Sequence, residues 1–189
     1  MQKAGIIDMF KKRDAFLSGH FRLTSGLHSG HYLQCALVLQ YPEDAAKLGR
    51  AIADKFRKDK IDVVAGPALG GIIIAYEVAR SLGVRCVFGE REEGRMKLRR
   101  GFSIKPGEKV LLAEDVATTG GSLKELARLI RESGGEIVGM ASIIDRSGGT
   151  TDFGVPFKTL MMLNIETFEE KDCPLCKECI PIMKPGSRK

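Results

Sequence analysis

Residues 110–122 read Val-Leu-Leu-Ala-Glu-Asp-Val-Ala-Thr-Thr-Gly-Gly-Ser. Four apolar residues lead into two adjacent acids, Glu114 and Asp115, and a turn of small polar residues follows. After the turn, apolar residues recur at the i, i+3, i+4, i+7 spacing of a helix face, at Leu123, Leu126, Ala127 and Ile130. The segment is therefore predicted to be a buried strand, a tight loop and an amphipathic helix, which is the repeating unit of an α/β fold.

The loop of this unit offers two kinds of binding group. Glycines 120 and 121 place free backbone N–H groups in front of a helix N-terminus, where an anion is favoured. The carboxylates of Glu114 and Asp115 accept hydrogen bonds without donating any, so they suit sugar hydroxyls or a metal ion. Together these groups predict a sugar phosphate ligand. The alternative is that the segment is an ordinary strand–turn–helix connection whose two acids are simply solvated. Such a connection does not need so many small polar residues in its turn, which favours the ligand site.

Two common phosphate-binding patterns do not match this segment. No Lys follows Gly121 directly, as a P-loop requires, and the Gly-x-Gly-x-x-Gly spacing of dinucleotide-binding folds is absent. The segment instead resembles the phosphoribosyl pyrophosphate (PRPP) signature of type I phosphoribosyltransferases: an apolar run, two acids, two variable residues, then Thr-x-Gly-x-Ser/Thr. By this resemblance the PRPP-binding residues are Glu114, Asp115, Val116, Ala117, Thr118, Thr119, Gly120, Gly121 and Ser122, together with Arg91.

Length and composition fit one globular domain. The chain has 189 residues, of which 43% are hydrophobic. No apolar run approaches the ~20 residues of a membrane span, and the N-terminus lacks the layout of a signal peptide, so we expect a cytoplasmic protein without a membrane partner. The net charge of +6 suits polyphosphate and carboxylate ligands. Because the bases are interleaved with acids and Trp is absent, a nucleic-acid partner is not expected.

The remaining chain alternates helix and strand patterns. Helices are expected over 43–57, 72–82 and 121–133, and strands over 61–65, 84–88, 110–113, 137–144 and 159–162. We therefore expect a doubly wound, mainly parallel sheet flanked by helices, which is the type I phosphoribosyltransferase fold. A single domain over 1–189 would comprise an N-terminal cap (1–40) with a helix and two short strands, an α/β core (41–165) and a C-terminal tail (166–189).

Three informative loops lie at the carboxyl ends of predicted strands, where ligands bind in such folds. They are 66–71, 90–100 and 114–122. The Gly-rich 66–71 loop lets the backbone approach an anion and resembles the family's pyrophosphate loop. The 90–100 loop holds five bases against three acids, and Gly94 lets it move and close over a charged leaving group.

The resemblance gives the basic loop a catalytic part. The catalytic candidates are Arg95, Lys97, Arg99 and Arg100, which cannot be separated individually, and Asp115. In the family this loop reaches the active site of the partner subunit, which implies a homodimer. The loop of this chain is shorter than is common and lacks the His found there in many members.

The N-terminal cap indicates the acceptor base. Its pattern Phe21-x-Leu23-x-Ser25-Gly26-x-x-Ser29-x-x-Tyr32 is similar to the segment that lines the base pocket of orotate phosphoribosyltransferases. Asp145-Arg146 also resembles a dipeptide whose Arg contacts orotate. By this resemblance the orotate-binding residues are Ser25, Gly26, Thr118 and Arg146. An Arg fork and a hydroxyl are suitable partners for the carboxylate and imide groups of orotate.

The implied activity is that of a glycosyltransferase acting in pyrimidine biosynthesis. It would transfer the phosphoribosyl group from PRPP to orotate, giving orotidine 5′-phosphate and pyrophosphate, with Mg²⁺ as cofactor. No residue is assigned as a metal ligand, because Mg²⁺ would be held mainly by pyrophosphate, ribose hydroxyls and water.

Two other functions stay open. A purine phosphoribosyltransferase would share the PRPP chemistry, but the cap and Arg146 argue against it. A PRPP-sensing regulator would keep the fold without turnover. The regulator stays open because Thr24 and Gly70 stand where many family members carry Lys.

Three of the five cysteines cluster as Cys173-Pro-Leu-Cys176-Lys-Glu-Cys179. Cys-x2-Cys is the spacing of half a zinc site. The only histidines, at 20, 28 and 31, are far away in sequence, and nothing in the sequence ties them to the cluster. We therefore expect a reduced, poorly ordered terminal segment without metal. A zinc site shared between two subunits and a disulfide both stay open.

Overall fold

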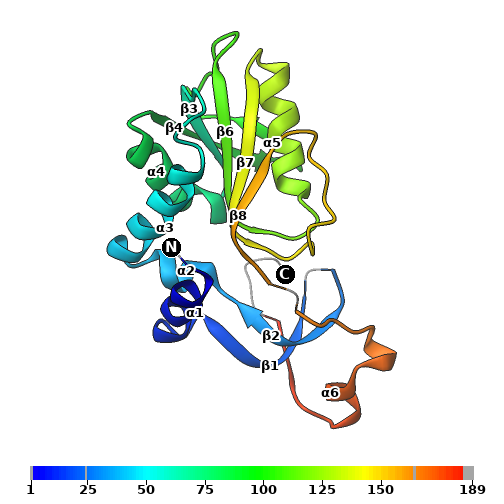
Figure 1. The fold of residues 1–189 in the computed structure, drawn as a ribbon. Coiled ribbons are helices and arrows are strands. Elements are labelled where there is room, and N and C mark those ends of the chain that lie inside the picture. The colour runs from blue at the N-terminus through cyan, green and yellow to red at the C-terminus, as the bar shows by residue number, and fades with distance from the viewer. Residues whose placement is uncertain (1, 24, 164, 185–189) are drawn as a thin grey trace.

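The larger part of the molecule is a six-stranded sheet. The computed structural model describes residues 2–23, 25–163 and 165–184 (Figure 1). The strand order is β5-β4-β3-β6-β7-β8, and every neighbouring pair is parallel except β4–β5. The strands are β3 (Val63–Pro67), β4 (Arg85–Glu92), β5 (Arg95–Leu98), β6 (Lys109–Ala117), β7 (Glu136–Asp145) and β8 (Phe157–Met162). The expected doubly wound, mainly parallel sheet is confirmed.

Helices cover both faces of this sheet (Figure 1). Side chains alternate along each strand, so Val64 and Leu111 pack toward α3 (Pro42–Lys55) and α4 (Gly70–Leu82). On the other face, Leu112 packs toward α5 (Gly121–Glu132). All three side chains are fully buried. Both faces of the central strands are therefore apolar, and their polar groups are confined to the strand ends.

The smaller part is built from both ends of the chain. The N-terminal elements are α1 (Lys3–Lys12), β1 (Phe16–Arg22), β2 (His28–Leu33) and α2 (Cys35–Leu39), and the sequence patterns did not predict α2. The C-terminal elements are a 3-10 turn (Glu170–Asp172), α6 (Pro174–Lys177) and β9 (Ile182–Met183). β9 pairs with β1 in parallel, giving a three-stranded sheet of order β2-β1-β9. We call β1, β2 and the described segment 165–184 the hood.

The expectation of a poorly ordered tail is wrong for 173–184. Backbone hydrogen bonds join His28 and Phe168 in both directions, at 2.8 and 2.9 Å. Cys173 is completely buried, and the β9–β1 pairing fixes the last described residues. Residues 185–189, which belong to the expected tail, lie outside the described residues. The tail is held by pairing with strands from the other end of the chain, which local composition does not reveal.

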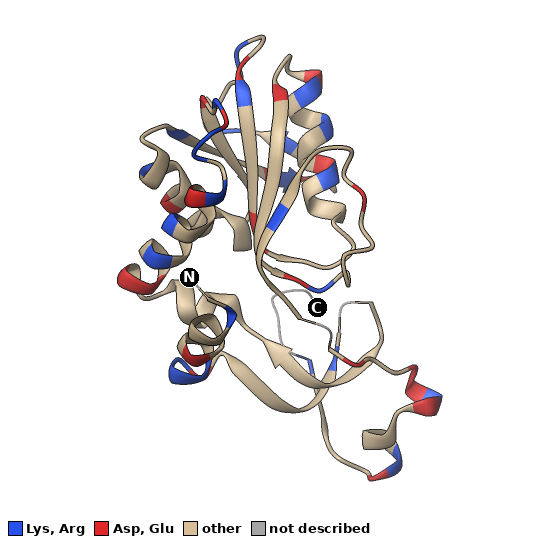
Figure 2. Ribbon diagram, in the orientation of Figure 1, with Lys and Arg blue, Asp and Glu red and all other residues tan. Residues whose placement is uncertain are grey.

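The region expected as a basic loop, 90–100, is mostly an antiparallel hairpin. β4 continues to Glu92, turns through Glu93 and Gly94, and returns as β5. Both turn residues have positive φ, 51° and 78°. The hairpin carries alternating charges rather than alternating apolar residues, so the strand pattern was not recognised. Figure 2 shows that Lys and Arg are interspersed with Asp and Glu over the molecule as a whole.

No helix in the described part of the chain is long and apolar enough to cross a membrane.

Candidate active site

Two adjoining cavities open where β6 and β7 end, facing the hood. Their volumes are about 700 and 420 Å³. Ser25, Val116, Thr118 and Thr119 line both cavities, so the two are immediate neighbours. This is the place expected for a ligand in an open, parallel α/β sheet.

The acid pair lies within the last part of β6, because the strand extends to Ala117 rather than ending at Ala113. Successive side chains point to opposite sides, so Glu114 lines the smaller cavity and Asp115 the larger. Oδ1 of Asp115 accepts the N–H of Val116 at 2.8 Å. Its other oxygen makes no hydrogen bond with the described residues and is available to a ligand.

Gly70 leaves room for the Asp115 carboxylate. A β-carbon at position 70 would lie only 2.7 Å from Oδ1 of Asp115, so a larger residue there would force the acid to move. Position 70 is one of the two places where the resemblance to phosphoribosyltransferases would lead us to expect Lys. The other, Thr24, lies outside the described residues.

Both acids have pKa values above their usual range. Burial raises the pKa of Glu114 from 4.5 to about 8, with a further increase from the Asp115 charge and an opposing effect of Arg91. Burial also raises the pKa of Asp115, against the hydrogen bond from Val116. A ligand with positive charge or hydroxyl donors would restore the ionised forms of both acids.

The turn after β6 has the geometry of an anion site. Thr119, Gly120, Gly121 and Ser122 line the smaller cavity at the start of α5. Gly120 has φ of 73°, and any side chain there would collide with the ring of Phe153. No side chain caps this twelve-residue helix, so its first N–H groups are available to an anion. Ala117 is buried and lines neither cavity.

Arg146 extends from the end of β7 into the larger cavity. Its backbone N–H donates to the carbonyl of Ala117 at 2.8 Å, which fixes the position of the residue. Its guanidinium is partly buried and makes no salt bridge or hydrogen bond with any described residue. Burial lowers the pKa of Arg146, and nearby Tyr32 acts against that shift. Arg remains charged in proteins, so this unpaired cation is suited to an anionic ligand.

Most of the hairpin bases are not at the cavities. Arg91 lines the smaller one and contacts Glu125 at 2.5 Å. Lys97 and Arg99 pair with Glu92, and Arg100 pairs with Glu90, at N–O distances of 2.6, 3.2 and 3.0 Å. Arg95, Lys97, Arg99 and Arg100 line neither cavity of their own chain, and neither does Gly26.

Comparison with known proteins identifies the family. The family model "Phosphoribosyl transferase domain" matches residues 37–166. The orotate phosphoribosyltransferase of Caldanaerobacter subterraneus subsp. tengcongensis is 56% identical over the full length of both chains. That of Caldicellulosiruptor saccharolyticus is 59% identical, covering 100% of this chain and 99% of its own. The chain belongs to the orotate phosphoribosyltransferase family.

Solved structures show the same fold. The orotate phosphoribosyltransferase from Aeropyrum pernix has a TM-score of 0.72 at 25% identity, over 84% of this chain and 93% of its own. An adenine phosphoribosyltransferase from Rhodothermus marinus has a TM-score of 0.66 at 22% identity, over 84% of this chain and 99% of its own. Proteins named for different bases therefore share this fold, so the fold alone does not identify the base.

Several lining residues were not predicted from the sequence. Ser147, Thr150 and Thr151 lie in the turn that follows Arg146 and line the larger cavity. A second small polar turn after a buried strand could have indicated them, as it did for 118–122. Ile165 and Thr167 also line this cavity, but they come from the hood, and no local pattern marks them.

The sequence interpretation of the histidines is also wrong. His20 and His28 lie beside Cys173 and Cys176 in the hood, and all four offer ligand atoms within 4.8 Å of one another. The β1–β2 hairpin brings the two histidines together, and the tail folds back over them. His31 is elsewhere, contacting Ser18, and Cys179 is exposed. This cluster is separate from the two cavities.

Proposed function

We propose that the protein transfers the phosphoribosyl group of PRPP to orotate, producing orotidine 5′-phosphate and pyrophosphate for pyrimidine biosynthesis. The observation that carries this proposal is the unpaired Arg146 guanidinium, which lines the same cavity as Asp115, next to the cavity that Glu114 and the α5 anion site line. A carboxylate on the acceptor base matches that cation, whereas adenine, guanine and hypoxanthine carry no carboxylate.

The chain's residues would act mainly by positioning and by electrostatic stabilisation. Thr119 to Ser122 would hold the 5′-phosphate, and Glu114 and Asp115 would accept the ribose hydroxyls. The base, held by Arg146 and the Thr118 hydroxyl, would then face C1 of the ribose from the larger cavity. As pyrophosphate leaves, C1 becomes cationic, and the Asp115 carboxylate stabilises that charge. No covalent enzyme intermediate is needed.

Mg²⁺ fits the donors at this site. The acid pair offers hard oxygen ligands, and the diphosphate and hydroxyls of PRPP offer others, while the ion keeps some of its waters. When bound, Mg²⁺ would neutralise charge on the departing pyrophosphate.

We also propose a homodimer in which the hairpin 85–98 and the turn after it reach the partner's cavities. The four bases that line no cavity of their own chain support this arrangement. A cytoplasmic location would suit phosphorylated substrates and five free cysteines.

A direct assay tests the proposed activity. The protein is incubated with PRPP, Mg²⁺ and either orotate, adenine, hypoxanthine or guanine, and the pyrophosphate released is measured. We expect turnover with orotate alone. Turnover with a purine and none with orotate would favour the purine enzyme. Binding of PRPP without release of pyrophosphate under any condition would favour the regulator.

Replacing Arg146 with Ala is expected to raise the KM for orotate by about 10- to 100-fold, because a charged hydrogen bond contributes about 1.5–3 kcal/mol. The KM for PRPP should change little, since the acid pair and the α5 turn are intact. Arg146→Lys should recover only part of the loss, because Lys lacks the planar fork. Arg128→Ala, an exposed change on α5, is the matched control. Equal increases in both KM values would contradict the assignment to the base.

The raised pKa of Glu114 predicts that PRPP·Mg²⁺ binding releases a proton below pH 8. The unliganded folded protein holds this proton between the usual pKa of 4.5 and about 8, whereas hydroxyl or cation ligands require the carboxylate. By the same linkage, this group's contribution to folding stability decreases as pH rises through that window. Titration calorimetry in buffers of different ionisation enthalpy counts the protons. The Glu114→Gln variant should not release this proton on binding. If the variant and the wild-type protein release the same number of protons, Glu114 is not the group that loses the proton.

A further inference from the structure

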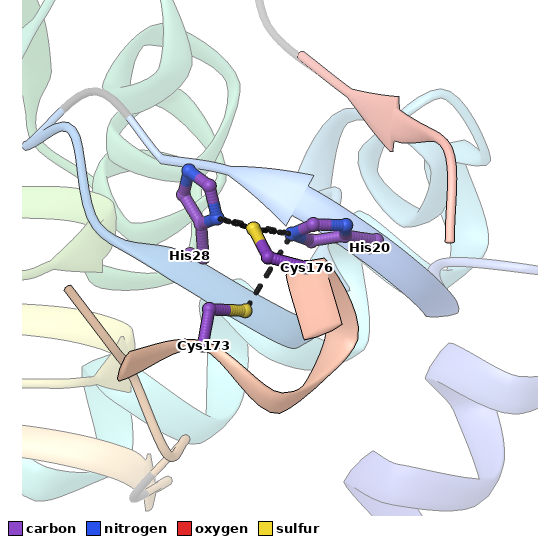
Figure 3. A group of neighbouring side chains, drawn as sticks. All are labelled: His20, His28, Cys173 and Cys176. Atoms are coloured by element: carbon purple, nitrogen blue, oxygen red, sulfur yellow. Dashed lines mark hydrogen bonds between the residues drawn. The ribbon is translucent and has the colours of Figure 1, made fainter. Parts of the chain in front are cut away.

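The hood holds a cluster of metal-ligating side chains (Figure 3), and none of them lines either cavity. His20 comes from β1, His28 from the first residue of β2, Cys173 from the residue before α6, and Cys176 from α6 itself. His20, His28 and Cys173 are buried, and Cys176 is partly buried. We propose that these four residues form a closed structural site for one Zn²⁺ ion within a single chain.

Four of the six distances between the ligand atoms are close to the edges of a tetrahedron around zinc, and the other two are no longer than 4.8 Å. With Zn–N of about 2.05 Å and Zn–S of about 2.3 Å, ideal edges are about 3.3 Å for N–N and about 3.6 Å for N–S. Nε2 of His20 and Nδ1 of His28 are 3.0 Å apart. The sulfurs of Cys173 and Cys176 lie 3.6 and 3.7 Å from Nε2 of His20, and Cys176 lies 3.2 Å from Nδ1 of His28.

The convergence on His20 favours coordination over ordinary hydrogen bonds. Nδ1 of His20 lies 2.8 Å from the carbonyl oxygen of Ile180. A carbonyl only accepts, so Nδ1 carries the proton and Nε2 presents its lone pair to the cluster. Three atoms lie close to that single lone pair: Nδ1 of His28 and the sulfurs of Cys173 and Cys176. The lone pair can accept a hydrogen bond from only one of them, whereas a metal ion can be bound by all four atoms. A His whose second nitrogen is held by a carbonyl is the usual arrangement around a bound metal.

The donor set selects zinc. Two thiolates and two imidazoles are soft to intermediate ligands, which disfavours Mg²⁺ and Ca²⁺ and suits a tetrahedral Zn²⁺ ion. Four protein ligands leave no open position, so the site would be structural rather than catalytic. The two pairs, His20 with His28 and Cys173 with Cys176, come from opposite ends of the chain.

Such an ion would fasten the tail to the β1–β2 hairpin. The tail has little apolar attachment of its own, because Ile180, Ile182 and Met183 are exposed and neither the 3-10 turn nor α6 has a buried side chain. Apart from Cys173, its attachment depends on short backbone pairings such as His28–Phe168 and on hydrogen bonds from His20 and Ser29 to its backbone carbonyls. Ile165 and Thr167, which line the larger cavity, lie at the start of segment 165–184, shortly before Cys173.

Metal analysis of the full-length protein tests the proposal without any activity assay. We expect about one zinc per chain, retained through gel filtration. Cys173→Ser and His20→Ala should lose it, whereas Cys179→Ser and Cys86→Ser should keep it, because those cysteines lie outside the cluster. Wild-type protein free of zinc after reconstitution would overturn the proposal. Full retention of zinc by the Cys173→Ser variant would also overturn it. Half a zinc per chain would overturn it too, because that ratio indicates a site shared between subunits.

Two further measurements use wild-type protein, so they test the proposal even if a variant fails to fold. Wild-type protein reconstituted with Co²⁺ should show thiolate-to-cobalt charge transfer and tetrahedral d–d bands, and octahedral bands would contradict the ligand set. Removing zinc with a chelator should lower the Tm of wild-type protein by on the order of 5 °C and expose segment 165–184 to protease. An unchanged Tm together with an oxidised Cys173–Cys176 pair in mass spectra would indicate a disulfide instead.

Discussion

Changing Asp115 to Asn is expected to lower kcat/KM for PRPP by about 100-fold or more. The backbone N–H of Val116 occupies Oδ1, so Oδ2 is the oxygen left for the ligand. Asn removes the charge and can present an N–H₂ donor where a ribose hydroxyl needs an acceptor. A loss of about 3 kcal/mol, from one charged hydrogen bond and reduced stabilisation of the cationic ribose, corresponds to about two powers of ten.

The same Asp-to-Asn change at Asp54 provides the control for this experiment. Asp54 lies on the exposed side of α3, pairs with Arg57 just after the helix, and lines neither cavity. Its variant should keep wild-type kinetics and stability. Steady-state kinetics with varied PRPP, and circular dichroism to confirm folding, complete the comparison. Kinetics of Asp115→Asn equal to those of wild type would exclude this carboxylate from the site.

Mixing two inactive variants is expected to restore about one quarter of wild-type activity, if hairpins serve the partner's cavities in a symmetric dimer. One variant carries Asp115→Asn. The other carries Lys97→Ala, Arg99→Ala and Arg100→Ala, which remove bases paired only with Glu90 and Glu92 in their own chain. After subunit exchange, about half of the dimers are mixed, and each mixed dimer has one site free of both defects.

Each variant alone, taken through the same exchange, gives the baseline for this measurement. The triple variant by itself should lose most turnover, because the bases stabilise the departing pyrophosphate. Its affinity for orotate should change little. A mixture no more active than the average of its parts would mean that the hairpin acts within its own chain, or that no dimer forms.

The sequence could predict the parts that depend on local patterns. The β6–α5 unit combines a buried run, polar turn residues and a helical stripe, and each of these is visible over fewer than 25 residues. Arg146 is different: its position after β7 was predictable, but its lack of an ion-pair partner among the described residues is not. That property depends on which acids the fold brings near it.

The hood and the charged hairpin could not be predicted in the same way. The hairpin 85–98 is stabilised by cross-strand ion pairs such as Lys97–Glu92, and its charge pattern is that of a solvated loop. The cluster of His20 with Cys173 joins residues 153 positions apart, so their spacing carries no signal. Long-range pairing of this kind appears only when the whole chain is folded.

The β9–β1 pairing has a consequence for how the protein is made. In the β1–β9 pairing His20 lies opposite Ile182, so the hood cannot close until the chain has been synthesised as far as Ile182. The six-stranded sheet is complete once Met162 has emerged, and it can fold first as a domain-sized unit. While the chain between Met162 and Ile182 is being synthesised, the cavity is bounded by the sheet, but the hood that covers it is incomplete. A chain that stops before Cys173 would keep every residue that lines the two cavities but would lack α6 and β9. Comparing its substrate affinity with that of the full chain would measure how much the closed hood contributes.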